Sequence, residues 1–435
     1  MTELRIESLA YGGDGVGHLP DGRAAFVPYG CPGDLVRVEV DADKGRFVRA
    51  SIAELLERST DRVPAPCPYF GICGGCSWQH VSAELQLQAK RQAVVDALMR
   101  IGGIPDAETR VTDAIASSEQ YGYRNKIELV AQTGASGLRL GYHRAGSDEL
   151  VPVESCLLLP PGYEKAPKAL SGALRYLSGR QDLGIRRVGL RVARNTRDVE
   201  LALWTEPGAF PRHAAAKTLA QALKTTGIVR VLVKGSDKER RVAGVEVLAG
   251  SGTWRERLLG RTMTVSAPSF FQVNTGAAES LVTLVLEELA VDGTDRVADL
   301  YAGAGTFTLP LAELAGDTIA VESAGSAVRD LRRNLETRNV WADVIGGDSA
   351  RELPALGQLD ALLLDPPRSG LQPEVAGALA ATHARTIVYV SCDPATLARD
   401  AKVLLGAGYG LDTATPVDLF PQSYHVETVA TFRRA

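Results

Sequence analysis

Between residues 266 and 435, short apolar runs alternate with longer amphipathic segments. The apolar runs predict buried strands at 296–300, 318–322, 342–345, 361–365 and 386–391. The amphipathic segments predict helices between them, for example at 326–337, and a further helix at 395–405. Strands that alternate with helices form a parallel sheet with right-handed crossovers, so we expect a doubly wound α/β domain at 266–435.

The first 60 residues follow a different pattern, in which turns rich in Gly, Pro and Asp separate short runs. In the run 35–40, Val36, Val38 and Val40 alternate with polar residues and share one face of a strand. Short strands at close spacing predict a small β-barrel at 1–60. The pattern fits a generic β-module or a nucleic-acid-binding barrel of the OB type, and it does not choose between them.

The middle of the chain, 61–265, predicts an α+β domain. A helix is expected at 82–101, where Gly102 and Gly103 end the apolar spacing, and this helix could pack on the C-terminal domain. A predicted hairpin holds five arginines between Arg186 and Arg197. Such a hairpin is either a solvated sheet face or a surface that contacts phosphates.

Composition narrows the class of protein. A length of 435 residues suggests about three domains, and 45% hydrophobic with 23% charged residues excludes global disorder. The net charge of −4 gives no evidence for a nucleic-acid partner, so such a claim must rest on local features. No apolar run reaches the length of a membrane span, and six cysteines are too few for a secreted disulfide scaffold. We expect a cytoplasmic protein, monomeric by default, with no membrane partner.

Three cysteines lie close together in a segment rich in Pro and Gly. Cys67, Cys73 and Cys76 have the spacing C-x₅-C-x₂-C, which predicts metal ligands because a loop needs no buried thiols. A closed site needs a fourth ligand, for which His80 and Cys156 are candidates. His80 would favour zinc, whereas Cys156 would suit either zinc or a [4Fe–4S] cluster.

The first two predicted strands of the α/β domain end in residues suited to a nucleoside ligand. Asp299 lies at the first strand end, and Gly303 and Gly305 in DLYAGAGTFT allow a ligand to approach the backbone closely. Thr308 stands where a dinucleotide site would need its third glycine. Glu322 follows Asp299 by 23 residues, where an acid accepts hydrogen bonds from ribose hydroxyls.

The later strand ends carry groups suited to catalysis. Asp348 follows the third strand, and Asp365 follows four apolar residues and precedes two rigid prolines. Cys392 ends the fifth strand just before a helix, whose N-terminus is expected to lower the thiol pKa. His425 and Glu427 begin the final strand, and either could act as a general base.

Together these motifs resemble the RNA uracil-5 methyltransferases of the TrmA/RumA type. FFQVN, DLYAGAGTFT, VES, LLLDPPR, YVSCDP and HVET follow one another in the order of that family. CGGCSWQH, with Cys67 and Cys156, is similar to the family's iron–sulfur site, and the barrel is similar to its RNA-binding TRAM module. Ala302, Ala304 and Asp393 depart from the family's pattern without removing a catalytic group.

The resemblance implies a Rossmann-like domain that uses S-adenosyl-L-methionine as methyl donor. It implies that this methyl donor is contacted by Gln272, Tyr301, Glu322 and Asp365. To these contacts we add Gly303 and Asp348 from their places at strand ends. It also implies that Cys392 is the nucleophile and Glu427 the base. The implied ligands of a [4Fe–4S] cluster are Cys67, Cys73, Cys76 and Cys156, which leaves His80 outside the ligand set.

The predicted activity is that of an RNA (uracil-5-)-methyltransferase. By resemblance to the ribosomal-RNA branch of the family, the barrel together with the cluster favours 23S ribosomal RNA as substrate, and transfer RNA is the alternative. Arg124, the barrel and the arginine-rich hairpin would position the RNA. Two other hypotheses are an enzyme that methylates an exocyclic amine, which normally needs an aromatic residue where Arg368 stands, and a non-catalytic RNA-binding protein with a structural metal, which leaves Cys392 and Glu427 without a role.

Overall fold

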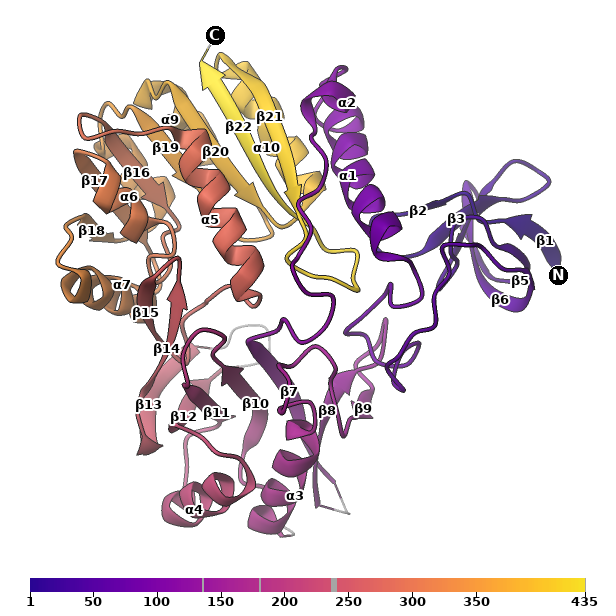
Figure 1. Cartoon of the computed structure of the whole chain (residues 1–435), viewed down its shortest axis with the longest axis horizontal. Coiled ribbons are helices and arrows are strands. Elements are labelled where there is room, and N and C mark those ends of the chain that lie inside the picture. The colour runs from indigo at the N-terminus through magenta and orange to yellow at the C-terminus, as the bar shows by residue number, and fades with distance from the viewer. Residues whose placement is uncertain (135–136, 180, 236–240, 435) are drawn as a thin grey trace.

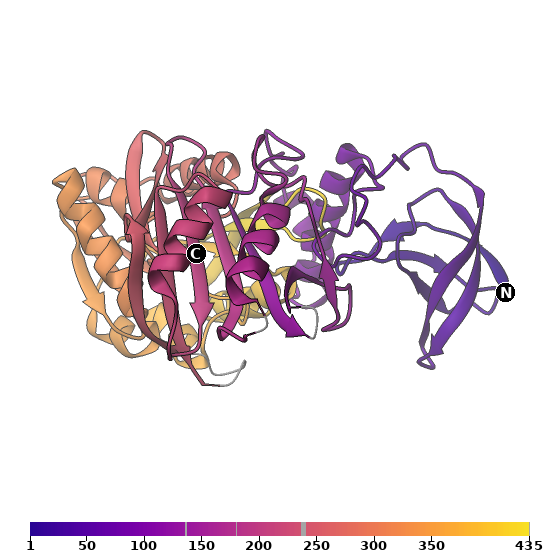
Figure 2. The same ribbon diagram turned by 90° about the horizontal axis from the view of Figure 1, so that it is seen from below.

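The chain folds into three parts. The computed structural model describes residues 1–134, 137–179, 181–235 and 241–434. A small β-domain at the N-terminus projects to one side, a central sheet carries two helices, and a second large sheet with helices completes the body (Figure 1). Turned by 90°, the β-domain again stands apart from the rest (Figure 2). No helix in the described part of the chain has the length and apolar character that a membrane span requires.

The N-terminal β-domain is a six-stranded sheet in the order β1-β5-β6-β4-β3-β2. Val36 and Val38 lie in its core as the alternation predicts, but Val40 is exposed because β5 runs on past the core. The prediction that Val40 shares the buried face is therefore wrong. The strands are β1 (Thr2–Arg5), β2 (Ser8–Leu9), β3 (Gly15–His18), β4 (Ala24–Val27), β5 (Leu35–Asp43) and β6 (Phe47–Glu57).

The central part is a seven-stranded sheet in the order β13-β12-β11-β10-β7-β8-β9. The predicted arginine-rich hairpin is present, since β10 and β11 pair antiparallel with Val192 opposite Val199. The strands are β7 (Lys126–Gly134), β8 (Gly137–His143), β9 (Leu150–Pro152), β10 (Ile185–Val192), β11 (Val199–Thr205), β12 (Gly227–Lys234) and β13 (Arg241–Gly250), and the helices are α3 (Ala166–Ser178) and α4 (Arg212–Ala222). The short helix α2 (Ala107–Arg110) precedes this sheet, and its Ala107 is buried in the core of the C-terminal domain.

A short hairpin links the central part to the C-terminal domain. Its strands are β14 (Thr253–Leu258) and β15 (Arg261–Ser266). Trp254, Met263 and Val265 are buried in the same apolar cluster as helix α5 (Thr275–Leu289). The core of the C-terminal domain therefore includes residues that precede position 266.

The C-terminal domain is a seven-stranded sheet in the order β18-β17-β16-β19-β20-β22-β21. Its first five strands are parallel, and β22 pairs antiparallel with β20 and β21. Each predicted strand is confirmed to within one residue. The strands are β16 (Arg296–Leu300), β17 (Asp317–Glu322), β18 (Asp343–Gly346), β19 (Ala361–Leu364), β20 (Thr386–Ser391), β21 (Tyr409–Val417) and β22 (Glu427–Arg434).

Helices surround this sheet and cover its apolar faces. They are α5, α6 (Thr308–Leu314), α7 (Gly325–Arg338), α8 (Ser349–Glu352), α9 (Pro373–Leu379) and α10 (Pro394–Gly406), with the 3-10 turns η1 (Leu353–Ala355) and η2 (Ala380–Thr382). β16 lies between β17 and β19, so the strand order reverses there. Ligands of open α/β sheets bind at such a point, beyond the carboxyl ends of the strands.

Helix α1 (Ala83–Arg100) precedes the central sheet in sequence but packs on the C-terminal domain. Ser82 caps it by accepting a hydrogen bond from the Leu85 amide. Val94, Val95 and Leu98 are buried in the core that also holds residues of β20 and α10. The predicted helix at 82–101 is thus confirmed, and it lies against α10 and β21.

A buried ion pair joins α1 to the segment between β21 and β22. Lys90 Nζ donates to Asp418 Oδ1 and to the Phe420 carbonyl oxygen, and both charged side chains are buried. Gln86 accepts a hydrogen bond from the Gln422 amide and donates one to the Gln422 side chain. These contacts fix residues 418–426, which lead directly into β22.

We expect Lys90→Met to lower the free energy of unfolding by about 3 kcal/mol, because it leaves the Asp418 carboxylate buried without its partner. Urea denaturation measures the change through a lower midpoint. Arg100→Met is the matched control, since Arg100 pairs with Asp96 in an exposed contact on the same helix and should shift the midpoint little. Equal effects of the two substitutions would contradict the prediction.

Candidate active site and thiol pocket

The predicted site residues of the C-terminal domain meet at one edge of its sheet. Leu300 pairs with Val321 on one side and with Leu364 on the other, so Tyr301, Glu322 and Asp365 follow three neighbouring strands. At the far side, Ser391 pairs with Thr428, which places Cys392 and Glu427 next to each other across the ladder of β20 and β22. The sheet register thus gathers residues that are far apart in sequence.

Glu322 holds the loop that follows β16. Its two carboxylate oxygens accept hydrogen bonds from the Gly303 amide at 2.8 Å and from the Ala324 amide at 2.6 Å. Gly305 has a φ of 95°, and a Cβ there would lie 2.5 Å from Leu309 Cδ1, so this part of the loop favours glycine. Tyr301 has a φ of 66°, a strained value for a residue with a side chain, and such strain is concentrated at functional sites.

Two acids flank this loop. Asp299 is buried, where Thr308 donates to it at 2.5 Å, and burial raises its pKa to about 7. Asp348 caps α8 by accepting from the Ala350 amide at 2.9 Å. The negative charge of Asp348 contributes to the raised pKa of Tyr301, after burial, which places these two residues near each other.

Asp365 and Glu427 are buried acids whose charged forms are disfavoured. Burial raises the pKa of Asp365 to about 8, with the charges of Asp299 and Glu322 adding to it. Burial and then the charge of Asp365 raise the pKa of Glu427 well above its usual value. A carboxylate with a raised pKa binds a proton more tightly, as a general base near neutral pH requires.

Cys392 is half-buried between the end of β20 and the start of α10. Asp393 caps that helix by accepting from the Ala395 and Thr396 amides. Burial and then the charge of Glu427 raise the pKa of the Cys392 thiol to about 11. The expectation that the helix start lowers this pKa is therefore wrong for the protein without ligands, because burial and a neighbouring acid outweigh a nearby helix terminus.

Arg368 is a site residue that the sequence analysis did not single out as functional. It follows the two prolines after Asp365, and its positive charge lowers the pKa of both the Cys392 thiol and the Glu427 carboxyl. The only signal in the sequence was its position in the turn after β19. Its guanidinium is the positive charge that faces the thiol.

His425 and Gln272 lie at the margins of this edge. Burial lowers the pKa of His425 to about 4, so the ring is neutral at pH 7, and it packs at 4.2 Å against the Tyr424 ring. Gln272 is buried, and Asn125 donates to its carbonyl oxygen at 2.8 Å. Within the described ranges, no hydrogen bond joins the Gln272 side chain to the other residues predicted to contact the methyl donor.

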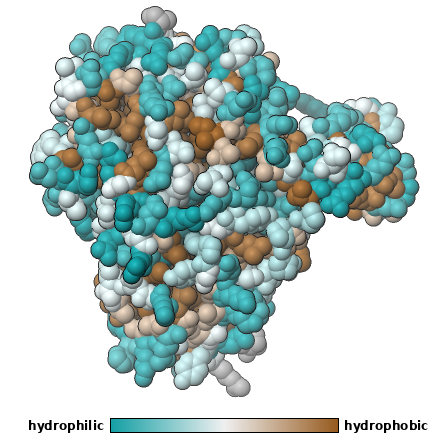
Figure 3. All heavy atoms as spheres, in the orientation of Figure 1, coloured by the Kyte–Doolittle hydropathy of each residue, from teal (hydrophilic) through white to brown (hydrophobic). Residues whose placement is uncertain are grey.

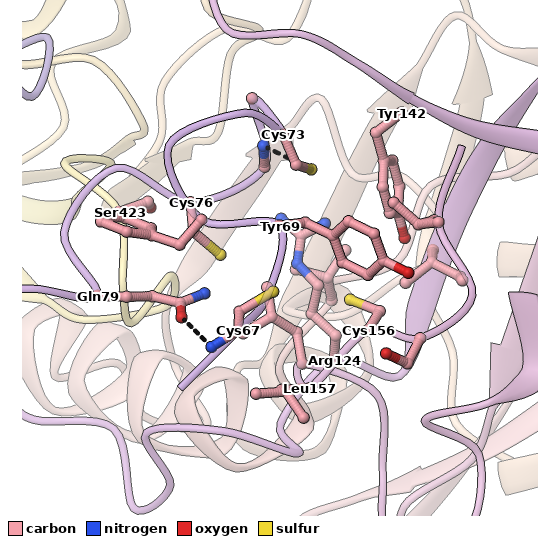
Figure 4. Close-up of a pocket in the computed structure, with 18 of the residues that line it drawn as sticks. Cys67, Tyr69, Cys73, Cys76, Gln79, Arg124, Tyr142, Cys156, Leu157 and Ser423 are labelled. Atoms are coloured by element: carbon pink, nitrogen blue, oxygen red, sulfur yellow. Dashed lines mark hydrogen bonds between the residues drawn. The ribbon is translucent and has the colours of Figure 1, made fainter. Parts of the chain in front are cut away.

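The four predicted cysteine ligands surround one cavity. Cys67, Cys73, Cys76 and Cys156 line a space of about 460 Å³ together with Arg124, and their side chains approach it from different segments of the chain (Figure 4). Burial raises the pKa of each of Cys73, Cys76 and Cys156, that of Cys76 to about 12. Cys31 lies apart from this cavity, buried in an apolar cluster with Trp78 and Val81.

The thiols are not drawn together around a single point. Among the residues that the structure describes, no three His, Cys, Asp or Glu side chains lie close enough to hold one metal ion. A [4Fe–4S] cluster spreads its four thiolate ligands over four irons, so its ligand sulfurs stand further apart than those around one ion. The set of four thiols around one cavity fits such a cluster by its chemistry.

His80 does not line this cavity. Its ring packs between Tyr29 and Phe70, and Nε2 lies 3.5 Å from the Gly30 carbonyl oxygen. Burial lowers its pKa to about 4. His80 therefore belongs to the contact with the β-domain rather than to the set of four thiols.

The arginine-rich hairpin is largely neutralised by its neighbours. Arg186 pairs with Glu206, Arg187 with Glu128, Arg191 with Glu200 in the interior, and Arg194 with Glu119. Arginines already paired with carboxylates offer little free charge to phosphates. The hairpin matches the interpretation as a structural sheet face better than that as an RNA contact.

Comparisons with known proteins indicate similarity to RNA methyltransferases. A model of the tRNA (uracil-5-)-methyltransferase family matches residues 212–435, and a model of the TRAM domain matches residues 2–53. An uncharacterized RNA methyltransferase of Thermosynechococcus vestitus is 35% identical over 98% of this chain and 97% of its own length. Another, of Thermotoga maritima, is 32% identical over 99% of this chain and 98% of its own.

One solved structure has the same architecture as this chain. It is that of Pyrococcus abyssi tRNA (uracil-54, C5)-methyltransferase in complex with S-adenosyl-L-homocysteine. It matches with a TM-score of 0.75 and 28% sequence identity, over 98% of this chain and 99% of that one.

The high pKa of Cys392 predicts a steep pH dependence for its alkylation. Below about 11 the thiolate fraction grows with pH, so the rate of modification by iodoacetamide should rise about tenfold per unit from pH 7 to 9. Mass spectrometry of the Cys392 peptide measures this rate. Glu427→Gln should speed the reaction at pH 8 because it removes a charge that opposes the thiolate, and Arg368→Gln should slow it. A plateau near pH 8 in the wild-type protein would contradict the prediction.

Proposed function

The chain belongs to the RNA uracil-5 methyltransferase family, and from this premise we propose that it methylates carbon 5 of a specific uridine in RNA through a covalent adduct between Cys392 and the uracil ring. The observation that carries the proposal is the placement of Cys392 and Glu427 side by side, at the same sheet edge as Asp365 and Glu322. This edge is where a doubly wound domain binds its ligands.

S-adenosyl-L-methionine supplies an electrophilic methyl group at its sulfonium. Glu322 is suited to accept hydrogen bonds from its ribose hydroxyls, and the loop at Tyr301 and Gly303 lies directly beside Glu322. Asp348, next to Tyr301, and Gln272 complete the proposed contacts. The Pyrococcus abyssi relative was crystallised with S-adenosyl-L-homocysteine, the product that remains when this donor has lost its methyl group.

Carbon 5 of uracil is too weak a nucleophile to take the methyl group unaided. Addition of the Cys392 thiolate to carbon 6 would form a carbon–sulfur bond and an enolate. Carbon 5 of this enolate would then take the methyl group as the bond between that methyl and the donor's sulfonium sulfur breaks, which leaves S-adenosyl-L-homocysteine. Carbon 5 now carries a methyl and a hydrogen. Glu427 takes that proton, the carbon 5–carbon 6 double bond forms again, and Cys392 leaves as thiolate.

The electrostatics of the edge support these roles. The positive charge of Arg368 favours the Cys392 thiolate, although burial and the charge of Glu427 outweigh it and hold the thiol pKa at about 11. At a pKa of about 8, Asp365 is largely protonated at pH 7 and is able to donate a hydrogen bond to a carbonyl oxygen of the uracil ring, in addition to contacting the methyl donor. A uridine paired in a helix must first be extruded to reach this edge.

For the cavity of four cysteines we propose a [4Fe–4S] cluster with Cys67, Cys73, Cys76 and Cys156 as ligands. Its role would be structural, because the proposed chemistry needs no electron transfer. The amides of Ser77 and Trp78, next to Cys76, both donate to the Gln422 carbonyl oxygen at 3.0 Å. A cluster that orders the cysteine segment thus supports the residues that lead to Glu427.

As substrate we propose 23S ribosomal RNA, on which the enzyme would act as a cytoplasmic monomer. Transfer RNA is the second candidate, because the Pyrococcus abyssi enzyme that shares this architecture is a tRNA methyltransferase. Mapping of 5-methyluridine in both RNAs from a strain that lacks the gene distinguishes them. Loss of the modification from transfer RNA alone would overturn the ribosomal proposal.

RNA that contains 5-fluorouridine should trap the adduct, because fluorine at carbon 5 cannot be removed as a proton. After incubation with S-adenosyl-L-methionine, a denaturing gel should show a shifted band with the wild-type enzyme and none with Cys392→Ala. Glu427→Gln should accumulate the same band on ordinary RNA, since proton removal fails. Cys31→Ala is the matched control for loss of a thiol and should behave like the wild type. A missing band with RNA that the enzyme methylates would refute the covalent route.

The enzyme purified without oxygen should contain about four irons and four sulfides per chain. Cys156→Ser should lose most of both, with the visible absorption of the cluster, whereas Cys31→Ser should keep them. Elemental analysis and absorption spectra provide the measurement. Stoichiometric zinc in place of iron, or equal loss from the two variants, would refute the cluster proposal.

A further inference from the structure

A groove opens between the β-domain and the cysteine segment, next to the proposed nucleophile. One wall is the β-domain, with residues 10–14, Tyr29 and Arg49, and the other is formed by Gly74, residues 76–77 and residues 145–146. The space between them is about 540 Å³. Figure 3 shows the β-domain as a separate lobe joined to the body by a narrow contact, so the groove lies where two parts of the chain meet.

Tyr11 stands at the end of this groove nearest to Cys392. Its hydroxyl lies 3.4 Å from the Cys392 carbonyl oxygen and 3.3 Å from Asp393 Oδ2, within reach to donate to either. Its ring meets that of Tyr424 at 85° with 5.4 Å between the ring centres. About a third of Tyr11 (36%) remains exposed, so part of an aromatic ring faces solvent beside the nucleophile.

Gly13 allows the loop that follows Tyr11 to approach the cysteine segment closely. Gly13 has a φ of 101°, and a Cβ there would lie 3.0 Å from Ser77 Cβ and 3.2 Å from Tyr424 Cδ1. The Gly13 carbonyl oxygen accepts a hydrogen bond from the buried indole of Trp78 at 3.0 Å. The β-domain is thus held against the body at the residues that follow Tyr11.

The groove also carries a positive charge. Arg49 is well exposed and meets Asp14 only at 3.5 Å, a long contact that leaves its guanidinium open to solvent. Burial raises the pKa of Asp14, and the charge of Arg49 acts in the opposite direction. Tyr29 adds a second aromatic ring to the same wall as Arg49.

We propose that this groove binds the nucleotides next to the target uridine, with Tyr11 stacked on the adjoining base and Arg49 contacting a phosphate. The inference rests on the proposed function. A uridine drawn out of its stack leaves a neighbouring base with one face uncovered, and proteins bind unstacked bases on aromatic side chains. An aromatic ring, an exposed arginine and continuity with Cys392 are features of a path for single-stranded RNA.

The probe is an unmodified hairpin from the RNA mapped above, with 2-aminopurine on either the 5′ or the 3′ side of the target uridine. Stacking quenches the fluorescence of this base. Tyr11→Ala should raise the fluorescence of one bound probe and raise KM for RNA about tenfold, because a stacked base contributes that much to binding. Tyr11→Phe keeps the ring and should change both values little. Tyr176→Ala is the matched control, since Tyr176 is an exposed tyrosine on α3, far from the groove (Figure 1).

Arg49→Ala should raise KM for every RNA tested and reduce the slope of log affinity against log salt by about one. Equal losses of kcat in Tyr11→Phe and Tyr11→Ala, with unchanged probe fluorescence, would overturn the proposal in favour of a role limited to the hydrogen bond at Cys392. Binding of the probes needs no catalysis. If the protein never traps 5-fluorouridine but its quenching of the probe depends on the Tyr11 ring, the groove is supported and the proposed reaction is refuted. Failure of the groove proposal can therefore be told apart from failure of the proposed function.

Discussion

The buried contact between Lys90 and Asp418 is the constraint on which the catalytic edge depends. Asp418 begins the segment that leads to His425 and Glu427, and the Phe420 carbonyl also accepts from Lys90. Nothing in that segment's own sequence fixes a loop of this kind. Its conformation is set from outside, by α1 through Lys90 and Gln86 and by the cysteine segment through two backbone amides. The middle of the chain thereby positions residues at its far end.

The chemistry of the edge follows from crowding of like charges in a buried place. Burial raises the pKa of Asp365 and of Glu427 first. The charge of Asp299 then raises that of Asp365, the charge of Asp365 raises that of Glu427, and the charge of Glu427 raises that of Cys392. Such an arrangement costs stability, since each group would be better solvated apart. In exchange it raises the pKa of Asp299 to about 7 and that of Asp365 to about 8, and it leaves the ionisation of the Cys392 thiol dependent on Arg368.

The features that could be predicted from the sequence are those that short-range patterns of apolar and polar residues determine. The five parallel strands and their terminal residues Glu322, Asp365 and Cys392 were predictable because buried strands leave continuous apolar runs. The exposure of Val40 was not, since it depends on where the core of the β-domain ends. The roles of Arg368 and Tyr11 depend on tertiary contacts, and Tyr11 lies 381 positions from Cys392. The pKa of Cys392 was predicted in the wrong direction because burial cannot be seen from a helix start alone.

The position of β22 in its sheet has a consequence for how the protein comes into being. This strand follows all the others in sequence, yet it lies between β20 and β21, so neither of those is fully paired until it is inserted. The same strand brings Glu427 to Cys392. In a nascent chain on the ribosome, the proposed nucleophile and base therefore come together only after this strand has emerged and closed the sheet.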